Sequence, residues 1–233
     1  MEYTYLLINF FTIIIPFVFS FHPKLRFYKT WNAFFPAVFI TAVIFIGWDV
    51  WFTHLGVWGF NPCYLTGLQI FNLPVEEVLF FFCIPYACVF TYHCLGLFLP
   101  EKSFDYRQRM ITLVLTIILI VMAVLFYEHL YTAVTFISLS IMLLLIMWIA
   151  KVNWLTKFYI VYAVLLIPFL IVNGTLTGTG LAEPVVWYNE TEIIGLRILT
   201  IPVEDVFYGL ELILMNVVLY EIFKSRSSKN IFA

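Results

Sequence analysis

The sequence predicts an all-α integral membrane protein of about seven transmembrane helices, and three observations lead to this fold class. Hydrophobic residues make up 64% of the 233 residues and charged residues only 11%, and the mean hydropathy is +1.01. A single water-soluble core could not bury so large an apolar fraction in a chain of this size. The apolar residues also form separate long runs, and the basic residues fall between alternate runs.

Seven apolar runs can each cross about 30 Å of hydrocarbon, which requires roughly 20 residues. They lie at 3–21, 32–48, 75–98, 110–127, 130–149, 157–173 and 202–223. The first run has no basic leading region and no Ala-x-Ala cleavage pattern, so we expect a retained helix and a mature chain that begins near Met1. The second and fourth runs are short, so counts of six or eight helices stay open.

The basic residues predict the orientation of these helices. Apart from Arg197, every Lys and Arg lies in a loop or tail on one side: Lys24, Arg26, Lys29, Lys102, Arg107, Arg109, Lys151, Lys157, Lys224, Arg226 and Lys229. The positive-inside rule makes this side cytoplasmic, so we expect a multi-pass protein of the cell membrane with its N-terminus outside and its C-terminus inside. The net charge of -2 provides no basic field, which excludes nucleic acid as a partner.

Several functions of membrane proteins are excluded by motifs that the chain lacks. The last run has no interior lysine for a retinal Schiff base, because Lys224 stands only at its end. The four histidines form no HxxH or HxxxH pair, so we expect no metal site of the iron hydroxylase kind. A diphosphate-binding DDxxD motif and a dinucleotide-binding GxGxxG motif are also missing, and we expect no cofactor.

An internal repeat organises the chain. Residues 61–77 recur without a gap as residues 189–205, and a tryptophan stands shortly before each copy. Each copy opens the third helix of a three-helix unit, and because three is odd, an extra helix must return the chain to the same face. We therefore predict two parallel three-helix repeats joined by an extra helix. The segments are 1–100 (first repeat), 101–129 (linking helix), 130–223 (second repeat) and 224–233 (cytoplasmic tail).

The most informative part of the repeat is Leu-Pro-Val-Glu-Glu at 73–77 and Ile-Pro-Val-Glu-Asp at 201–205. Pro74 and Pro202 suit the start of a helix, and the acids fall in its first turn. These acids could simply offset the positive helix end, worth about 0.3–1 kcal/mol each. Ionisable groups in a membrane span are costly, however, and usually serve a reaction or a pathway. The candidate catalytic residues are Glu76, Glu77, Glu204 and Asp205.

Four carboxyl groups that meet in a dry cleft cannot all be ionised, so one can remain an acid beside a carboxylate base. Helical spacing places Glu204, Tyr208 and Glu211 on one face of the last helix, and Glu76 and Phe80 on the matching face of the earlier one. We therefore predict that Glu76 and Glu204 face inward and that their neighbours support them. Further supporting candidates are Asp49, Phe80, Tyr208, Glu211, and Asn61 and Asn189, which either bind the carboxyl groups or form loop turns.

With these residues the chain resembles the small membrane-bound lycopene β-cyclases, which occur as two-subunit bacterial enzymes, archaeal single chains and the cyclase part of fungal bifunctional carotenoid proteins. The signature of that family is Pro-x-Glu-Glu/Asp. It stands here at 74–77 and again at 202–205. The likeness covers both halves, so the chain is similar to a fused form of the two-subunit type.

The resemblance implies an intramolecular lyase or isomerase of carotenoid biosynthesis. In such an enzyme an acid protonates the terminal alkene of lycopene, the neighbouring double bond captures the cation, and a base removes a proton to leave a β-ionone ring. The product would be β-carotene, with γ-carotene after the first ring, and no redox change occurs. The implied partners are lycopene, the lipid bilayer and other enzymes of the carotenoid pathway. Glu76, Glu77, Glu204 and Asp205 would share proton donation, proton removal and cation stabilisation.

Two other functions stay open from the sequence. A small proton-coupled transporter or channel would also use repeats and paired buried carboxylates. A purely structural membrane subunit would leave the paired acids unexplained. Conversion of a carotenoid pigment separates the enzyme from both alternatives.

Overall fold

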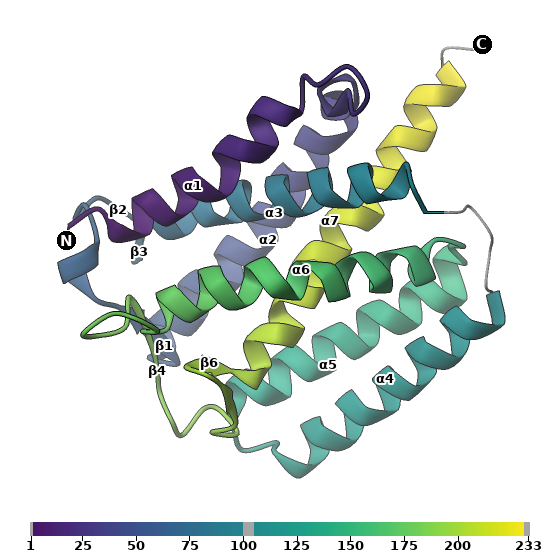
Figure 1. Cartoon of the computed structure of the whole chain (residues 1–233). Helices are drawn as coiled ribbons and strands as arrows, with labels where there is room; N and C mark the ends of the chain where they lie inside the picture. Colours follow the sequence, from purple (N-terminus) through teal and green to yellow (C-terminus); the bar gives the residue numbers. More distant parts are fainter. Residues whose placement is uncertain (1, 100–104, 231–233) are drawn as a thin grey trace.

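The computed structural model describes residues 2–99 and 105–230, and its main helices confirm the predicted all-α fold (Figure 1). These are α1 Thr4–Phe19, α2 Trp31–Leu55, α3 Val75–Gly96, α4 Asp105–Leu125, α5 Leu130–Leu145, α6 Leu155–Leu176 and α7 Val203–Asn230. The 3-10 helices η1 Phe27–Thr30 and η2 Pro62–Tyr64 and the π-helical turn η3 Ile146–Ala150 connect or extend them. Residues 224–230 of the predicted tail continue α7, whereas Lys102 and residues 231–233 lie outside the described residues.

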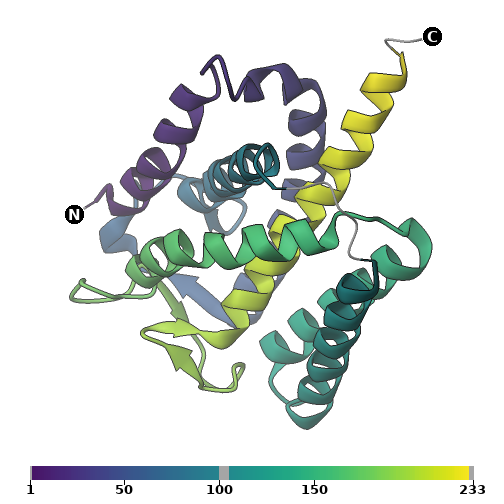
Figure 2. The ribbon, with the colours of Figure 1, turned by 45° about the vertical axis from the view of Figure 1, so that its right-hand side comes forward.

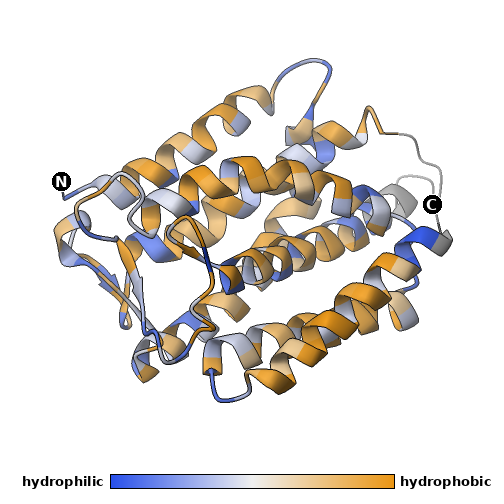
Figure 3. Ribbon diagram, turned by 60° about the horizontal axis from the view of Figure 1, so that its bottom comes forward, coloured by the Kyte–Doolittle hydropathy of each residue, from blue (hydrophilic) through white to orange (hydrophobic). Residues whose placement is uncertain are grey.

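The helices have the length and surface of membrane-spanning elements. Six of the described helices are long and apolar enough to cross a bilayer, and α1, with 16 residues, is shorter. At 1.5 Å per residue α1 measures about 24 Å. Large apolar side chains such as Phe11, Val124 and Ile171 are about two-thirds exposed, which suits a lipid environment. Figure 3 shows hydrophobic helices and more hydrophilic connecting loops, as expected of a multi-pass membrane protein.

Helix α7 is the central element of the bundle (Figures 1 and 2). It packs against α2 and α5 and also contacts α3 and α6, while α1 packs along α3. Helix α4, the predicted linking helix, packs chiefly on α5 at the edge of the bundle. The three-helix repeats therefore form most of the core, and the extra helix joins it from the edge of the bundle through Leu119 and Ala123.

Short strands at one end of the bundle show the repeat most directly. Strand β2 Gln69–Ile70 pairs with β3 Leu73–Pro74, and β5 Arg197–Ile198 pairs with β6 Ile201–Pro202 in the same register. The two hairpins share their unusual backbone angles: φ is 83° at both Gly67 and Gly195, 57° at Phe71 and 58° at Leu199. Positive φ at a bulky residue is uncommon. Its occurrence at equivalent positions indicates that both halves fold by the same local rules.

A third strand pair joins the two halves. Strand β1 Trp58–Phe60 pairs antiparallel with β4 Val186–Tyr188, and the central partners are Gly59 and Trp187. These two residues occupy equivalent positions of the repeat. The residue pairs on either side of them are related to each other by the same equivalence of the two repeats. Such self-complementary pairing places a pseudo-twofold axis between Gly59 and Trp187. It confirms the prediction of two parallel repeats.

The contact at this axis predicts the effect of a side chain at position 59. A Cβ atom on Gly59 would lie 2.3 Å from Cζ2 of the Trp187 ring, so Gly59→Ala must displace the ring. We expect a loss of about 1–3 kcal/mol, which is typical of overpacking. Thermal unfolding in detergent measures it. Gly47→Ala on α2 is the matched control, because open space surrounds that position.

The double variant Gly59→Ala/Trp187→Ala should recover most of the stability, because it removes the ring that blocks the new methyl group. An equal loss in the single and the double variant would show that the Trp187 contact is not the cause.

Candidate active site

A cavity of about 870 Å³ lies between α1, α3, α6 and α7, next to the strands that join the two repeats. Its polar end holds three carboxylates from three helices, Asp49, Glu77 and Asp205. Four tyrosines surround them: Tyr5, Tyr131, Tyr188 and Tyr208. Most of the remaining lining is aliphatic or aromatic. The cavity thus combines a compact acid cluster with a long apolar chamber.

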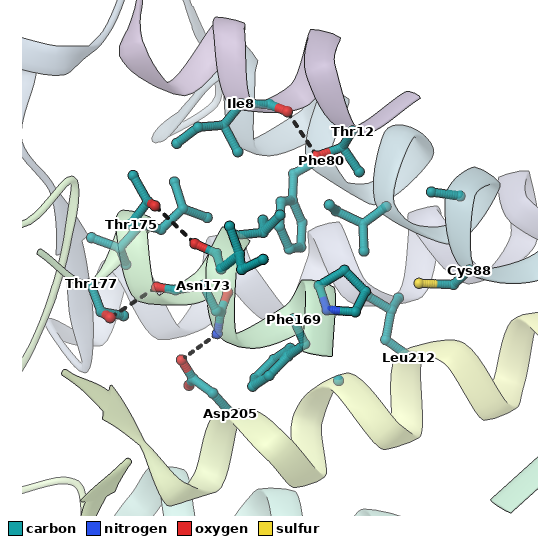
Figure 4. A pocket seen from close by; sticks show the side chains of 18 of the residues that line it. Ile8, Thr12, Phe80, Cys88, Phe169, Asn173, Thr175, Thr177, Asp205 and Leu212 are labelled. Atoms are coloured by element: carbon teal, nitrogen blue, oxygen red, sulfur yellow. Dashed lines mark hydrogen bonds between the residues drawn. The ribbon is translucent and has the colours of Figure 1, made fainter. Parts of the chain in front are cut away.

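The cavity extends far along the bundle. The lining residues of α3 run from Glu77 to Thr91, a rise of about 21 Å along the helix. Figure 4 shows Asn173 and Asp205 at one end, Cys88 toward the other, and Phe80 and Phe169 between them. Such a shape suits a long apolar chain with its reactive end at the carboxyl groups.

One side of the cavity opens toward the surroundings of the bundle. Four of its lining residues on α1 and α6 are at least half exposed: Leu7 (50%), Phe11 (65%), Ile15 (63%) and Ile171 (67%). All four are apolar, and all lie on membrane-embedded helices. This side of the cavity therefore suits an apolar ligand better than a polar one.

Glu76 and Glu204 do not line the cavity, so the prediction that they face inward is wrong. Both side chains are fully buried, and each binds the backbone of the loop before its helix. The Thr66 N–H donates to Glu76 Oε1 at 2.7 Å, and the Ile194 N–H donates to Glu204 Oε1 at 2.7 Å. Because the hairpin folds back over the helix start, these N–H groups need an acceptor. The first acid of each motif supplies it.

Glu77 and Asp205, the second acids of the motifs, line the cavity instead. Helical rotation of about 100° per residue turns them inward once their neighbours face the loops. The Tyr5 hydroxyl donates to Glu77 Oε2 at 2.6 Å. Asp205 accepts from the hydroxyls of Tyr131 at 2.7 Å and Tyr188 at 2.8 Å. The two halves thus present equivalent carboxyl groups to one chamber.

Two helices outside the motifs contribute further polar groups. The carboxyl group of Asp49 on α2 lines the same polar end of the cavity as that of Glu77, and the Tyr208 hydroxyl donates to Asp49 Oδ1 at 3.2 Å. The Asn173 amide on α6 donates to Asp205 Oδ2 at 2.9 Å (Figure 4). Asp49 and Tyr208 were predicted as supporting residues, and the structure brings both to the acid cluster.

Four residues at the acid cluster are not among those predicted from the sequence: Tyr5, Tyr131, Tyr188 and Asn173. A signal for two of them was present, because Tyr5 and Tyr131 stand near the starts of the first helices of the two repeats. Tyr188 lies in β4, outside the membrane-spanning helices, and burial raises its pKa well above the usual value. Its hydroxyl therefore stays protonated and remains a hydrogen-bond donor.

The other supporting candidates fall into three groups. Phe80 lines the cavity beside the acid cluster. Asn61 and Asn189 form loop turns, accepting from the backbone of Cys63 at 3.0 Å and Thr191 at 3.1 Å, and Pro74 and Pro202 end the hairpins. Glu211 is buried between α5 and α7, accepts a hydrogen bond from Ser138 at 2.8 Å and does not line the cavity.

Aromatic rings enclose the acid cluster. Tyr131 and Tyr188 stack with centroids 6.0 Å apart, and Trp58 meets Tyr131 edge-on at 5.1 Å. The ring centroids of Trp48 and Tyr208 lie 5.3 Å apart, on the side of the cluster formed by α2 and α7. The faces of such rings attract positive charge. A cation formed next to the carboxyl groups would be stabilised by the aromatic rings and by the carboxyl groups.

The loop contact of Glu76 predicts different effects for two substitutions. Glu76→Gln keeps an oxygen for the Thr66 N–H and should change stability little, whereas Glu76→Ala leaves that donor unpaired. We expect Glu76→Ala to lose about 1–3 kcal/mol of stability. Thermal unfolding and proteolysis of the loop before α3 measure the difference. Equal stability of the two variants would show that the hydrogen bond does not hold the loop.

Comparison with known proteins agrees with this arrangement. Neither the curated proteins nor the solved structures contain a match to the chain. The model of the lycopene cyclase family, however, matches residues 2–95 and 128–223, which hold α1, α2, α5 and α6 and most of α3 and α7. The match covers most of the chain and leaves out α4, the helix without a partner in the repeat. The chain therefore belongs to the lycopene cyclase family.

Proposed function

We propose that this family member is a lycopene β-cyclase that acts by acid–base catalysis in the cavity between its two repeats. The observation that carries the proposal is the meeting of Glu77 and Asp205, equivalent acids from the two motifs, at the polar end of an apolar chamber. Such a chamber accepts a carotenoid chain, and two buried carboxyl groups supply an acid and a base. Glu76 and Glu204 act in the proposal by holding the loops that close this end.

The reaction balances without a cofactor. A carboxylic acid gives its proton to C2 of the terminal double bond, and positive charge develops at C1. The double bond between C5 and C6 attacks C1, so the new C1–C6 bond closes the ring and the charge moves to C5. A carboxylate removes the proton from C6 and leaves a double bond between C5 and C6. Proton and electron counts are unchanged, as an isomerase requires.

The surroundings of the carboxyl groups support this mechanism. Water would capture the cation, and the long apolar lining disfavours water next to the reacting end. Aromatic faces from Trp58, Tyr131 and Tyr208 offer the cation electrostatic stabilisation that is already in place.

The lateral opening supports a two-step use of the same site. Lycopene enters between α1 and α6, places one end at the acid cluster, and leaves as γ-carotene with one ring. It then returns with its other end inward, and the second ring gives β-carotene. We place the acid cluster near the outer membrane face, with the N-terminus outside and the basic loops in the cytoplasm, as the positive-inside rule expects.

The proposal predicts the pigments of a bacterium that accumulates lycopene and expresses this chain. Wild-type protein should convert lycopene to γ-carotene and β-carotene, as measured by chromatography of the extracted pigments. Glu77→Gln and Asp205→Asn should each lower conversion at least about 100-fold, the usual range for an acid or base. Glu211→Gln, which alters a buried carboxyl group outside the cavity, is the matched control and should remain active. Unchanged lycopene with well-expressed wild-type protein would contradict the proposal and favour transport.

The width of the cavity at Gly209 makes a second prediction. A Cβ atom there would sit 3.5 Å from Phe169 and from the Tyr162 hydroxyl, so Gly209→Ala fits while Gly209→Phe fills the chamber. We expect Gly209→Phe to lose cyclisation and to keep its fold, because the added ring occupies the space for the substrate. Pigment analysis together with thermal unfolding tests both parts. An active Gly209→Phe variant would place the substrate elsewhere.

A further inference from the structure

The two halves of the acid cluster are related by the repeat but differ in one group. In the second half, Asn173 on α6 binds Asp205. In the first half, helix α2 brings Asp49 to the same polar end of the cavity as Glu77, a carboxyl group in place of an amide. Asp49 lies outside the duplicated motif, is 3% exposed and lines the cavity. This difference distinguishes the two motif acids chemically.

Asp205 is surrounded by hydrogen-bond donors. Its Oδ1 atom accepts from Tyr131, and its Oδ2 atom accepts from Tyr188 and from the Asn173 amide. An ionised carboxyl group accepts on both oxygens, whereas a protonated one must use one oxygen to donate. Three donors from three elements therefore favour the carboxylate form of Asp205. A carboxylate in this position is ready to take up a proton.

Glu77 is placed differently, because a second carboxyl group, that of Asp49, shares the polar end of the cavity with it, and one hydroxyl, that of Tyr5, donates to it. Two ionised carboxylates in one dry chamber repel each other, so neighbouring carboxyl groups favour a shared proton. The remaining contacts stabilise the pair without removing that proton: Tyr5 donates to Glu77 and Tyr208 donates to Asp49. This arrangement favours one retained proton on the Asp49–Glu77 pair.

We propose that the Asp49–Glu77 pair is the acid that protonates the substrate and that Asp205 is the base that removes the proton from the ring. The assignment rests on the proposed function and divides the roles within that site. The pair gives one proton to C2, and Asp205 takes one from C6, so each ring leaves the total number of protons in the cluster unchanged. Asp49 acts as a positioning residue that keeps Glu77 supplied with a proton.

Isotope exchange in heavy water separates the acid from the base. The purified protein in lipid vesicles is given lycopene, and mass spectrometry measures deuterium in the rings and in the recovered lycopene. Wild-type protein should place one deuterium in each ring. Asp49→Asn and Glu77→Gln should lower ring formation at least about 100-fold and leave the recovered lycopene without deuterium, because no cation forms.

Asp205→Asn should also lose the β-ring, but with a different signature. The cation still forms in this variant and must lose a proton without its base, so the recovered lycopene gains deuterium at C2 or ring isomers with a shifted double bond appear. A merely structural effect of either substitution would lower both signals together. Deuterated lycopene from Asp49→Asn, or normal β-ring formation by it, would overturn the proposal.

Two further variants keep the test decisive. Glu211→Gln is the matched control for a buried carboxyl group and should retain ring formation and labelling. Asn173→Asp places a second carboxyl group beside Asp205 and should weaken the base while the acid stays intact. It should therefore give the labelling signature of Asp205→Asn. This variant tests the assignment even if Asp49→Asn does not fold. Absence of that signature in folded Asn173→Asp protein would count against the assignment. If wild-type protein leaves lycopene unchanged and unlabelled, the proposed function fails first.

Discussion

Each half of the protein depends on a buried carboxyl group that binds the backbone of the loop before it. Glu76 and Glu204 accept from N–H groups ten positions earlier, and these contacts fold the hairpins back over the starts of α3 and α7. A backbone donor at the edge of a membrane protein needs such a partner, because little water reaches it. Once the first acid faces the loop, helix geometry turns the second acid into the cavity. The position of the second acid in the cavity therefore follows from a structural hydrogen bond.

The pseudo-twofold axis brings two equivalent acids together, yet the large cavity that they line lies on one side of it. The related space between α2 and α7 is filled by Phe45, Phe81 and Leu212 in a packed cluster. On the other side, α6 lines the cavity together with α1 and α3, and the space between these helices remains open. Duplication thus supplied the paired acids, and divergence of the packing between helices made one side a chamber.

Much of this architecture could be predicted from the sequence, because it depends on long-range patterns that composition and repetition preserve. Hydropathy located the helices, and the duplicated Pro-Val-Glu motif located the acids at the starts of α3 and α7. Which of two adjacent acids faces the cavity could not be predicted, because either side of a helix can face inward. The contact between the first acid and the loop decides this. The partners Tyr5, Asp49 and Asn173 lie on other helices, and the sequence does not indicate how those helices are rotated relative to one another.

The edge position of α4 has a consequence for the chain as a single molecule. No described residue of α4 lines the cavity, and the two repeats hold each other through β1 with β4 and through α2 with α7. Covalent continuity across α4 therefore fixes topology and stoichiometry, while the lining of the cavity comes from the two repeats. The molecule is in effect a tethered pair of unequal protomers, whose mutual contacts through β1 with β4 and α2 with α7 lie outside the tether.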